Sequence, residues 1–172
     1  MKKVVMVIAP QDFRDEELLE PKAILEKCGV EVKVASASTD IALGKLGAKV
    51  KPDLLIKDIR TKDFDVVIFV GGIGASRYFD DQLVHQLLKD ALKENRVVAA
   101  ICIAPVILAR AGVLKDKRAT VFSSEEKEIK GAGARYSGRP VERDGNIITA
   151  AGPFAATEFG REIAKALGVS QC

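Results

Sequence analysis

The chain has no tryptophan, a single histidine and only three cysteines. Cys28, Cys102 and Cys172 are odd in number and widely spaced, with no CxxC pair, so neither a disulfide framework nor a zinc knuckle is predicted. We therefore expect free thiols in a reducing compartment, with Cys28 in the core and Cys172 a tail thiol without a visible role.

Long apolar runs are also missing, and none approaches the length of a membrane span. The apolar run at residues 4–9 is too short for a signal peptide and is closed by Pro10. The 27 basic and 24 acidic residues are interspersed, without the basic stripe or aromatic platform of a nucleic-acid binder. We expect a cytoplasmic protein with neither nucleic-acid nor membrane partners.

The 172 residues, 48% of them hydrophobic, are enough for one domain, residues 1–172, with a substantial core. Strand-like and helix-like segments alternate, which predicts an α/β fold with a mostly parallel sheet and helices on both faces. In such sheets, ligands bind in the loops at the carboxyl ends of the strands. Residues 36–57 are predicted as hairpin strands or an excursion from the sheet, and the Asp144-Gly145 pair predicts a hairpin. The expected strands cover about 4–9, 30–35, 65–70, 97–101 and 119–122, and the expected helices about 16–28, 81–95 and a final one to 167.

Cys102 lies between an apolar strand pattern, Val97–Ile101, and a helix pattern that begins near Pro105. A side chain at such a turn projects over the edge of the sheet and stands at the positive end of the next helix. That position favours the thiolate, the reactive form of cysteine. The alternative is a small buried hydrophobe, which is how most free cysteines behave.

Glu17 stands out among the acids near the start of the first helix. An inward carboxyl is costly unless it has a partner or stays protonated, and a protonated Glu17 could donate a hydrogen bond to Cys102. The alternative, an acid favoured by the helix dipole, suits Asp15 and Glu16 better. Helical spacing places Glu17 on the inward stripe with Pro21, Ile24 and Cys28.

The Gly71-Gly72-Ile73-Gly74 segment follows a buried strand and matches neither the dinucleotide fingerprint nor a P-loop. It is either a plain tight turn or a loop with exposed amides for an anion. In the second case, the amides of Gly72 and Ile103 would form an oxyanion hole.

His85 is expected to face solvent, because its apolar neighbours mark a different side of the helix as inward. A Cys-His couple within one chain would have to use this residue, so cysteine-protease chemistry is poorly supported. The neighbours that define the inward side are Val84, Leu87, Leu88 and Ala91.

Three separated motifs resemble the ThiJ/PfpI superfamily, which includes archaeal-type intracellular proteases and the parkinsonism-associated deglycase. They are the acidic helix start at residues 15–21, the strand ending in Val70-Gly71-Gly72, and the elbow at residues 99–105. The Asp144-Gly145 hairpin and Gly152-Pro153 also sit where that family has theirs. The likeness covers nearly the whole chain.

The resemblance implies a flavodoxin-like three-layer sandwich with a nucleophile elbow. It implies that Cys102 is the nucleophile, that Glu17 is the acid touching its sulfur, and that the amides of Gly72 and Ile103 form the anion pocket. A homodimer or larger homo-oligomer is usual for the family, whereas cofactors are not, and no metal site is expected. The other residues that would line the pocket are Gly71, Gly152 and Pro153.

The sequence also departs from that family. Protease-like members have a histidine directly after the nucleophile, where this chain has Ile103. They also use a glutamate after the double glycine, supplied across an oligomer interface, where this chain has Ser76 or its neighbours. The histidine that the deglycase branch has after the strand ending in Val121-Phe122 is absent too.

Three functions remain under consideration. The first is a cysteine enzyme acting on small reactive carbonyls, of the glyoxalase or deglycase kind, with Cys102 as nucleophile and Glu17 as proton shuttle. The second is a non-enzymatic redox sensor or stress-protective protein that works through oxidation of Cys102. The third, an intracellular cysteine peptidase, is disfavoured because no histidine follows Cys102.

Overall fold

A seven-stranded sheet forms the middle layer of the computed structural model, which describes residues 1–169 and 172. Its strand order is β11-β12-β8-β7-β1-β3-β6, and every neighbouring pair is parallel except β11 with β12. The predicted α/β, flavodoxin-like architecture is therefore confirmed. The strands are Lys3–Val7 (β1), Glu31–Ser36 (β3), Leu54–Leu55 (β6), Val66–Phe69 (β7), Val97–Ile101 (β8), Val141–Asp144 (β11) and Ile147–Ala150 (β12).

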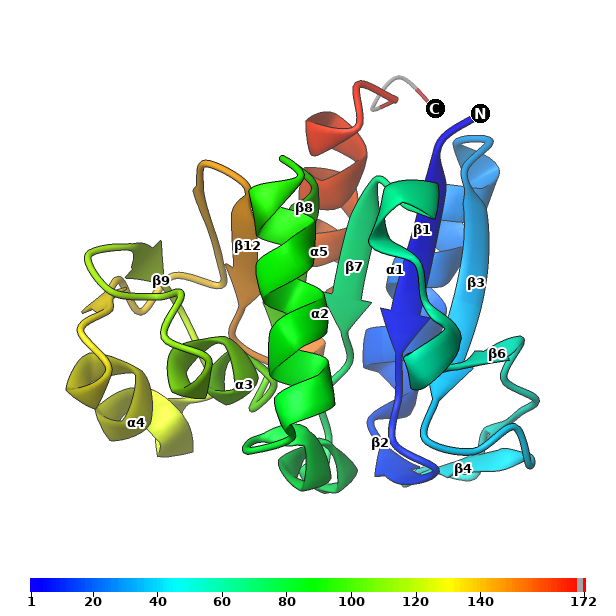
Figure 1. Ribbon diagram of the computed structural model, residues 1–172, viewed down its shortest axis with the longest axis horizontal. Helices are drawn as coiled ribbons and strands as arrows, with labels where there is room; N and C mark the ends of the chain where they lie inside the picture. Colours follow the sequence, from blue (N-terminus) through cyan, green and yellow to red (C-terminus); the bar gives the residue numbers. More distant parts are fainter. Residues whose placement is uncertain (170–171) are drawn as a thin grey trace.

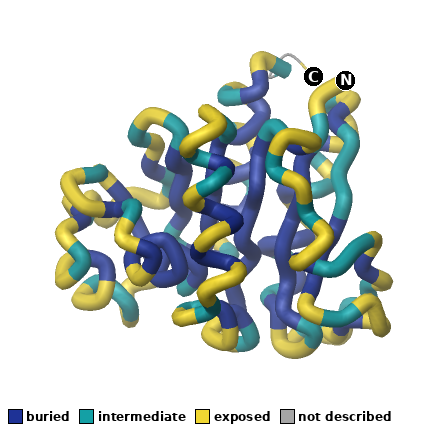
Figure 2. Tube along the Cα trace, viewed as in Figure 1, coloured by how far each residue is buried: buried dark blue, intermediate teal, exposed yellow. Residues whose placement is uncertain are grey.

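Helices cover both faces of this sheet (Figure 1). α1 (Asp15–Lys27) and α5 (Ala156–Ala166) lie on one face, and α2 (Gln82–Lys93), α3 (Pro105–Arg110) and α4 (Glu126–Gly131) lie on the other. Successive residues of β1 alternate between the two cores, as the period of a strand requires. Because both sides are covered, the central strands are buried along their length (Figure 2).

α1 and α5 pack closely against each other. A Cβ atom on Gly160 of α5 would lie 2.9 Å from the Cα atom of Pro21 in α1, so this approach depends on glycine. Within the described residues, no helix is long and apolar enough to cross a membrane.

Two small sheets lie outside the main one. The first combines β2 (Gln11–Phe13), β4 (Ala42–Gly44) and β5 (Lys49–Val50), so part of the 36–57 segment forms a hairpin while β6 joins the main sheet. The second pairs β9 (Arg118–Ala119) with β10 (Arg135–Tyr136), and β9 is shorter than the strand predicted there. The 3₁₀ helices are Ile56–Asp58 (η1), Thr61–Asp63 (η2), Ile73–Tyr78 (η3), Ser123–Glu125 (η4) and Pro153–Ala155 (η5).

The predicted hairpin near residue 145 is confirmed. Asp144 pairs with Ile147, which leaves Gly145 and Asn146 as the two turn residues. Gly145 has φ 59°, a left-handed conformation that glycine adopts at little cost.

The expectation of free thiols is wrong for two of the three cysteines. Cys28, directly after α1, is joined to Cys172 by a disulfide across 144 residues of sequence. Cys102 is the free cysteine among the described residues. Cysteine spacing could not reveal this pair, because the two residues come together only through the packing of α1 beside α5.

Candidate active site

Cys102 stands at a sharp corner between β8 and α3. Its φ of 66° is uncommon for a residue with a side chain, and surrounding backbone bonds hold it there. Its N–H donates to the carbonyl oxygen of Ala150 at 2.9 Å, and its own carbonyl accepts from the N–H of Phe122 at 2.8 Å. Pro105 then opens α3 at a position where the missing N–H costs nothing. This geometry is that of a nucleophile elbow.

Glu17 lies on the inward face of α1 and is fully buried. Gly71, after β7, stands between it and Cys102. A Cβ atom on Gly71 would lie 2.6 Å from the Cβ atom of Cys102 and 2.9 Å from Oε1 of Glu17. The absence of a side chain at residue 71 therefore allows the carboxyl and the thiol to lie side by side.

Burial raises the pKa of Glu17 from 4.5 to about 8. The neighbouring Cys102 thiol opposes this rise most, and the Arg14 guanidinium opposes it next. Neither carboxyl oxygen accepts a well-aligned hydrogen bond from the described residues. Glu17 is therefore a protonated acid at neutral pH, whose proton can be directed at the sulfur.

The expectation that the elbow favours a ready thiolate is wrong for the protein as folded. Cys102 is only 8% exposed, and burial followed by the Glu17 charge raises the pKa of its thiol to about 12. Backbone hydrogen bonds from Gly72 and Ile103 act in the opposite direction. Burial is the largest cause of this rise, so Cys102 is a protonated thiol at neutral pH.

The structure brings the sequence-predicted site residues together at the carboxyl edge of the sheet. The backbone amides of Gly72 and Ile103 both hydrogen-bond to the Cys102 sulfur and act to lower the pKa of its thiol. Gly72 has φ 91°, and a Cβ atom there would lie 2.6 Å from the carbonyl oxygen of Asp12, so this approach also requires glycine. Gly152 follows β12, the neighbour of β8, and Pro153 begins η5.

Sequence reasoning missed three residues near the site. Arg14 precedes α1, its Nε donates to Oε2 of Glu16 at 3.1 Å, and its charge acts on both Glu17 and Cys102. The rings of Phe122 and Phe154 both approach Gly152, each 3.2 Å from where a Cβ atom on Gly152 would be. They are 38% and 73% exposed, so they form an apolar rim. The phenylalanine two residues after Gly152 was the available sequence signal for Phe154.

Asp15 has a structural role. It is 6% exposed, and its carboxylate accepts the N–H groups of Leu46 at 2.9 Å and Ala48 at 2.8 Å. It thereby ties the start of α1 to the β4–β5 hairpin, beyond the favourable helix-dipole position expected for it.

The prediction that His85 faces solvent is wrong. The residue is 5% exposed, and its Nε2 lies 2.7 Å from the carbonyl oxygen of Phe79. The bond to this carbonyl satisfies one ring nitrogen, which allows the imidazole to be buried. α2 packs on the face opposite to α1, so His85 does not meet Cys102.

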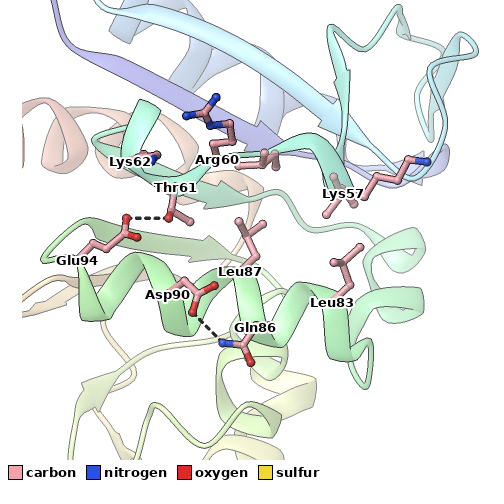
Figure 3. Close-up of a pocket in the computed structure, with 11 residues that line it drawn as sticks. Lys57, Arg60, Thr61, Lys62, Leu83, Gln86, Leu87, Asp90 and Glu94 are labelled. Carbon is pink, nitrogen blue, oxygen red and sulfur yellow. Dashed lines mark hydrogen bonds between the residues drawn. The ribbon is translucent and has the colours of Figure 1, made fainter.

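A groove of about 320 Å³ lies elsewhere, between η1–η2 and α2 (Figure 3). Four of its polar side chains pair with one another: Thr61 donates to Glu94 and Gln86 donates to Asp90, both at 2.7 Å. We place the candidate site at Cys102, because the groove offers no counterpart to the thiol beside a buried carboxyl with a raised pKa.

The fold and this corner define a class: flavodoxin-like α/β proteins with a cysteine at a nucleophile elbow, beside a buried acid. Residues 2–166 match the model of the DJ-1/PfpI family. The chain belongs to the DJ-1/PfpI family.

Related proteins align with this chain along nearly its whole length. An uncharacterized protein of Methanocaldococcus jannaschii is 46% identical, with 96% of this chain and 82% of that protein covered. The glutathione-independent glyoxalase DJR-1.2 of Caenorhabditis elegans is 29% identical, with coverage of 96% and 89%. Deglycase PfpI of Pyrococcus furiosus is 30% identical, with coverage of 95% and 98%. A ThiJ/PfpI domain protein from Brachyspira murdochii superimposes with a TM-score of 0.95 at 35% identity, covering 96% of each chain.

Proposed function

We propose that this protein is a cysteine-dependent enzyme acting on small reactive carbonyl compounds such as methylglyoxal. The observation that carries the proposal is the pairing of Cys102 with an acid that keeps its proton at neutral pH, under two backbone amides. Thiol addition to an aldehyde needs a proton removed from sulfur and one delivered to oxygen, and this pair can do both.

The chemistry balances without a strong external base. The Cys102 sulfur bonds to the aldehyde carbon while the carbonyl π bond breaks. Glu17 gives its proton to the new oxygen and receives the thiol proton, and the amides of Gly72 and Ile103 stabilise the developing alkoxide. In the hemithioacetal, the C1 hydrogen moves to C2 and the C1 hydroxyl proton moves to the C2 oxygen, which oxidises C1 to a thioester and reduces C2 to an alcohol. Water then hydrolyses the thioester, which releases lactate and restores the thiol.

The surroundings of the sulfur suit a small substrate of this kind. Phe122 and Phe154 offer an apolar rim for a methyl group, and Arg14 supplies a cation near the acid. Among relatives, the Caenorhabditis elegans protein is named a glyoxalase and the Pyrococcus furiosus protein a deglycase.

The test is lactate production from methylglyoxal by pure protein. Cys102→Ala should lose at least about 100-fold in rate, and Glu17→Gln about 10- to 100-fold, the usual range for loss of general acid–base help. Cys172→Ser, at the opposite end of the sheet, is the matched cysteine control and should keep the activity. Equal turnover by wild type and Cys102→Ala would refute the proposal.

A second candidate is redox sensing through Cys102. The same proton donor and two amides that would stabilise an alkoxide could hold the oxygens of a sulfinate. Intact-mass analysis after mild peroxide should then show a stable gain of two oxygens on Cys102. Oxidation no faster than that of a solvent-exposed model thiol would remove this candidate.

Peptidase activity would require a base from a second subunit, because His85 lies in the other layer of the fold.

We also propose a homodimer or larger homo-oligomer, supported by exposed apolar side chains around the β4–β5 hairpin. Light scattering coupled to size exclusion tests this assembly, and a monomer at micromolar concentration would contradict it. These exposed residues are Ile41, Leu43 and Leu46.

A further inference from the structure

A second cavity lies at the end of the molecule opposite to Cys102, where α1 and α5 both finish. Its volume is about 330 Å³, which is within the range of small-molecule sites. The Cys28–Cys172 disulfide forms part of its lining, with Ile24 as an apolar neighbour. Figure 1 shows the two chain ends on this side of the sheet, away from the carboxyl ends of the strands.

The charged residues that line this cavity are all cations: Lys27, Arg161 and Lys165. Within residues 1–169 and 172, neither Lys27 nor Arg161 forms an ion pair, and Lys165 reaches Glu162 only at 3.9 Å. The chain as a whole is nearly balanced, with 27 basic and 24 acidic residues. A concave surface lined by three cationic side chains and no acidic side chain therefore attracts anions locally, with the terminal carboxylate of Cys172 as the one opposing charge that its lining residues carry.

The disulfide is accessible from this cavity. Cys172 is exposed and Cys28 is partly exposed. Cysteine sulfur in a disulfide is attacked by thiolates, and access is one of the factors that set the rate. A cavity that concentrates anions beside an accessible disulfide raises the local concentration of negatively charged thiols.

We propose that the Cys28–Cys172 disulfide and its cationic cavity form a thiol–disulfide exchange site for anionic low-molecular-weight thiols. The thiolate sulfur bonds to the exposed Cys172 sulfur, and the Cys28–Cys172 bond breaks. Cys28 leaves as a thiolate and takes a proton from water. A second thiol can then release Cys172, with the two small thiols leaving as their own disulfide.

Three two-carbon thiols of different charge test this site on the full chain. They are 2-mercaptoethanesulfonate (anionic), 2-mercaptoethanol (neutral) and cysteamine (cationic), with rates compared per unit thiolate concentration. The measurement is the rate of disulfide opening, followed by mass spectrometry after alkylation. The anionic thiol should react roughly fivefold to tenfold faster than the neutral one, with the cationic thiol slowest. Equal rates for the three, or the reverse order, would overturn the proposal.

The charge variants provide the matched control. Arg161→Gln with Lys27→Gln should reduce the advantage of the anionic thiol to roughly twofold or less and leave the neutral thiol unchanged. Lys22→Gln with Lys33→Gln, a pair of substitutions outside the cavity, should keep the full rate advantage of the anionic thiol over the neutral one. If the cavity variant fails to fold, salt provides a second measurement on the wild type. The advantage should fall several-fold between about 0.01 and 1 M ionic strength, as the Debye length shortens from ~30 to ~3 Å. An advantage that is independent of salt would contradict the site.

Discussion

At the scale of single residues, the raised pKa of Glu17 makes stability depend on pH. Folding raises this pKa from 4.5 to about 8, so between these values the native state binds a proton that the unfolded state has lost. The stabilisation is fully present below about pH 4.5 and is lost as pH rises through about 8. The free energy of unfolding should therefore fall by about 1.4 kcal/mol per pH unit across this window, with other groups adding their own slopes.

Glu17→Gln isolates that contribution, because glutamine keeps the shape of the protonated acid without titrating. Urea unfolding at pH 5, 6, 7 and 8 should show a markedly flatter pH dependence for this variant than for wild type. Glu20→Gln, an exposed glutamate on the same helix, should retain the wild-type slope. Parallel slopes for wild type and Glu17→Gln would show that Glu17 is ionised in the folded protein.

Gly71 permits the thiol–acid contact, and this too is a property of one residue. In Gly71→Ala, the new methyl group would meet the Ile101 carbonyl oxygen and the Cys102 Cβ atom at 2.6 Å, and backbone atoms cannot move aside cheaply. We expect a loss of about 1–3 kcal/mol in stability and a loss of methylglyoxal turnover. Thermal unfolding and the lactate assay measure both.

Gly131→Ala is the matched control for that substitution. Nothing lies within 4 Å of a Cβ atom at Gly131, which ends α4, so stability should be unchanged or slightly higher. Normal turnover by Gly71→Ala would mean that the two side chains need not touch.

At the scale of elements, Asp15 couples α1 to the β4–β5 hairpin. Asp15→Ala leaves the N–H groups of Leu46 and Ala48 without their acceptor, which should cost about 2–4 kcal/mol. Hydrogen exchange at those two amides should accelerate more than exchange in the central strands. Asp40→Ala, at an exposed position just before β4, is the control and should change neither. Unchanged protection at residues 46 and 48 in Asp15→Ala would refute this role.

The elements themselves could be predicted because periodicity and turn chemistry are local. The period of α1 alone identified Glu17 as inward, and an apolar strand broken by a cysteine before Pro105 identified the elbow. His85 could not be placed, because its burial depends on a carbonyl from Phe79 that lies outside the helix. Arg14 was also missed, since its effect comes from its distance to Glu17 and Cys102 in three dimensions.

At the scale of the whole molecule, the Cys28–Cys172 disulfide links segments 144 residues apart. A link that closes so long a loop restricts the unfolded chain strongly and should contribute about 2–5 kcal/mol. Reductant or Cys172→Ser should therefore lower the midpoint of urea unfolding. Methylglyoxal turnover at 25 °C should persist, because the Pro21–Gly160 contact still positions α1 and with it Glu17.

Unfolding curves with and without dithiothreitol measure this contribution. Wild type should lose stability on reduction, whereas Cys172→Ser should already be at the lower midpoint and be insensitive to the reagent. Cys102→Ser retains the disulfide and should show the same drop on reduction as wild type, which separates the link from the free thiol. A wild-type midpoint that is unaffected by complete reduction would mean that packing between α1 and α5 alone holds this end of the molecule together.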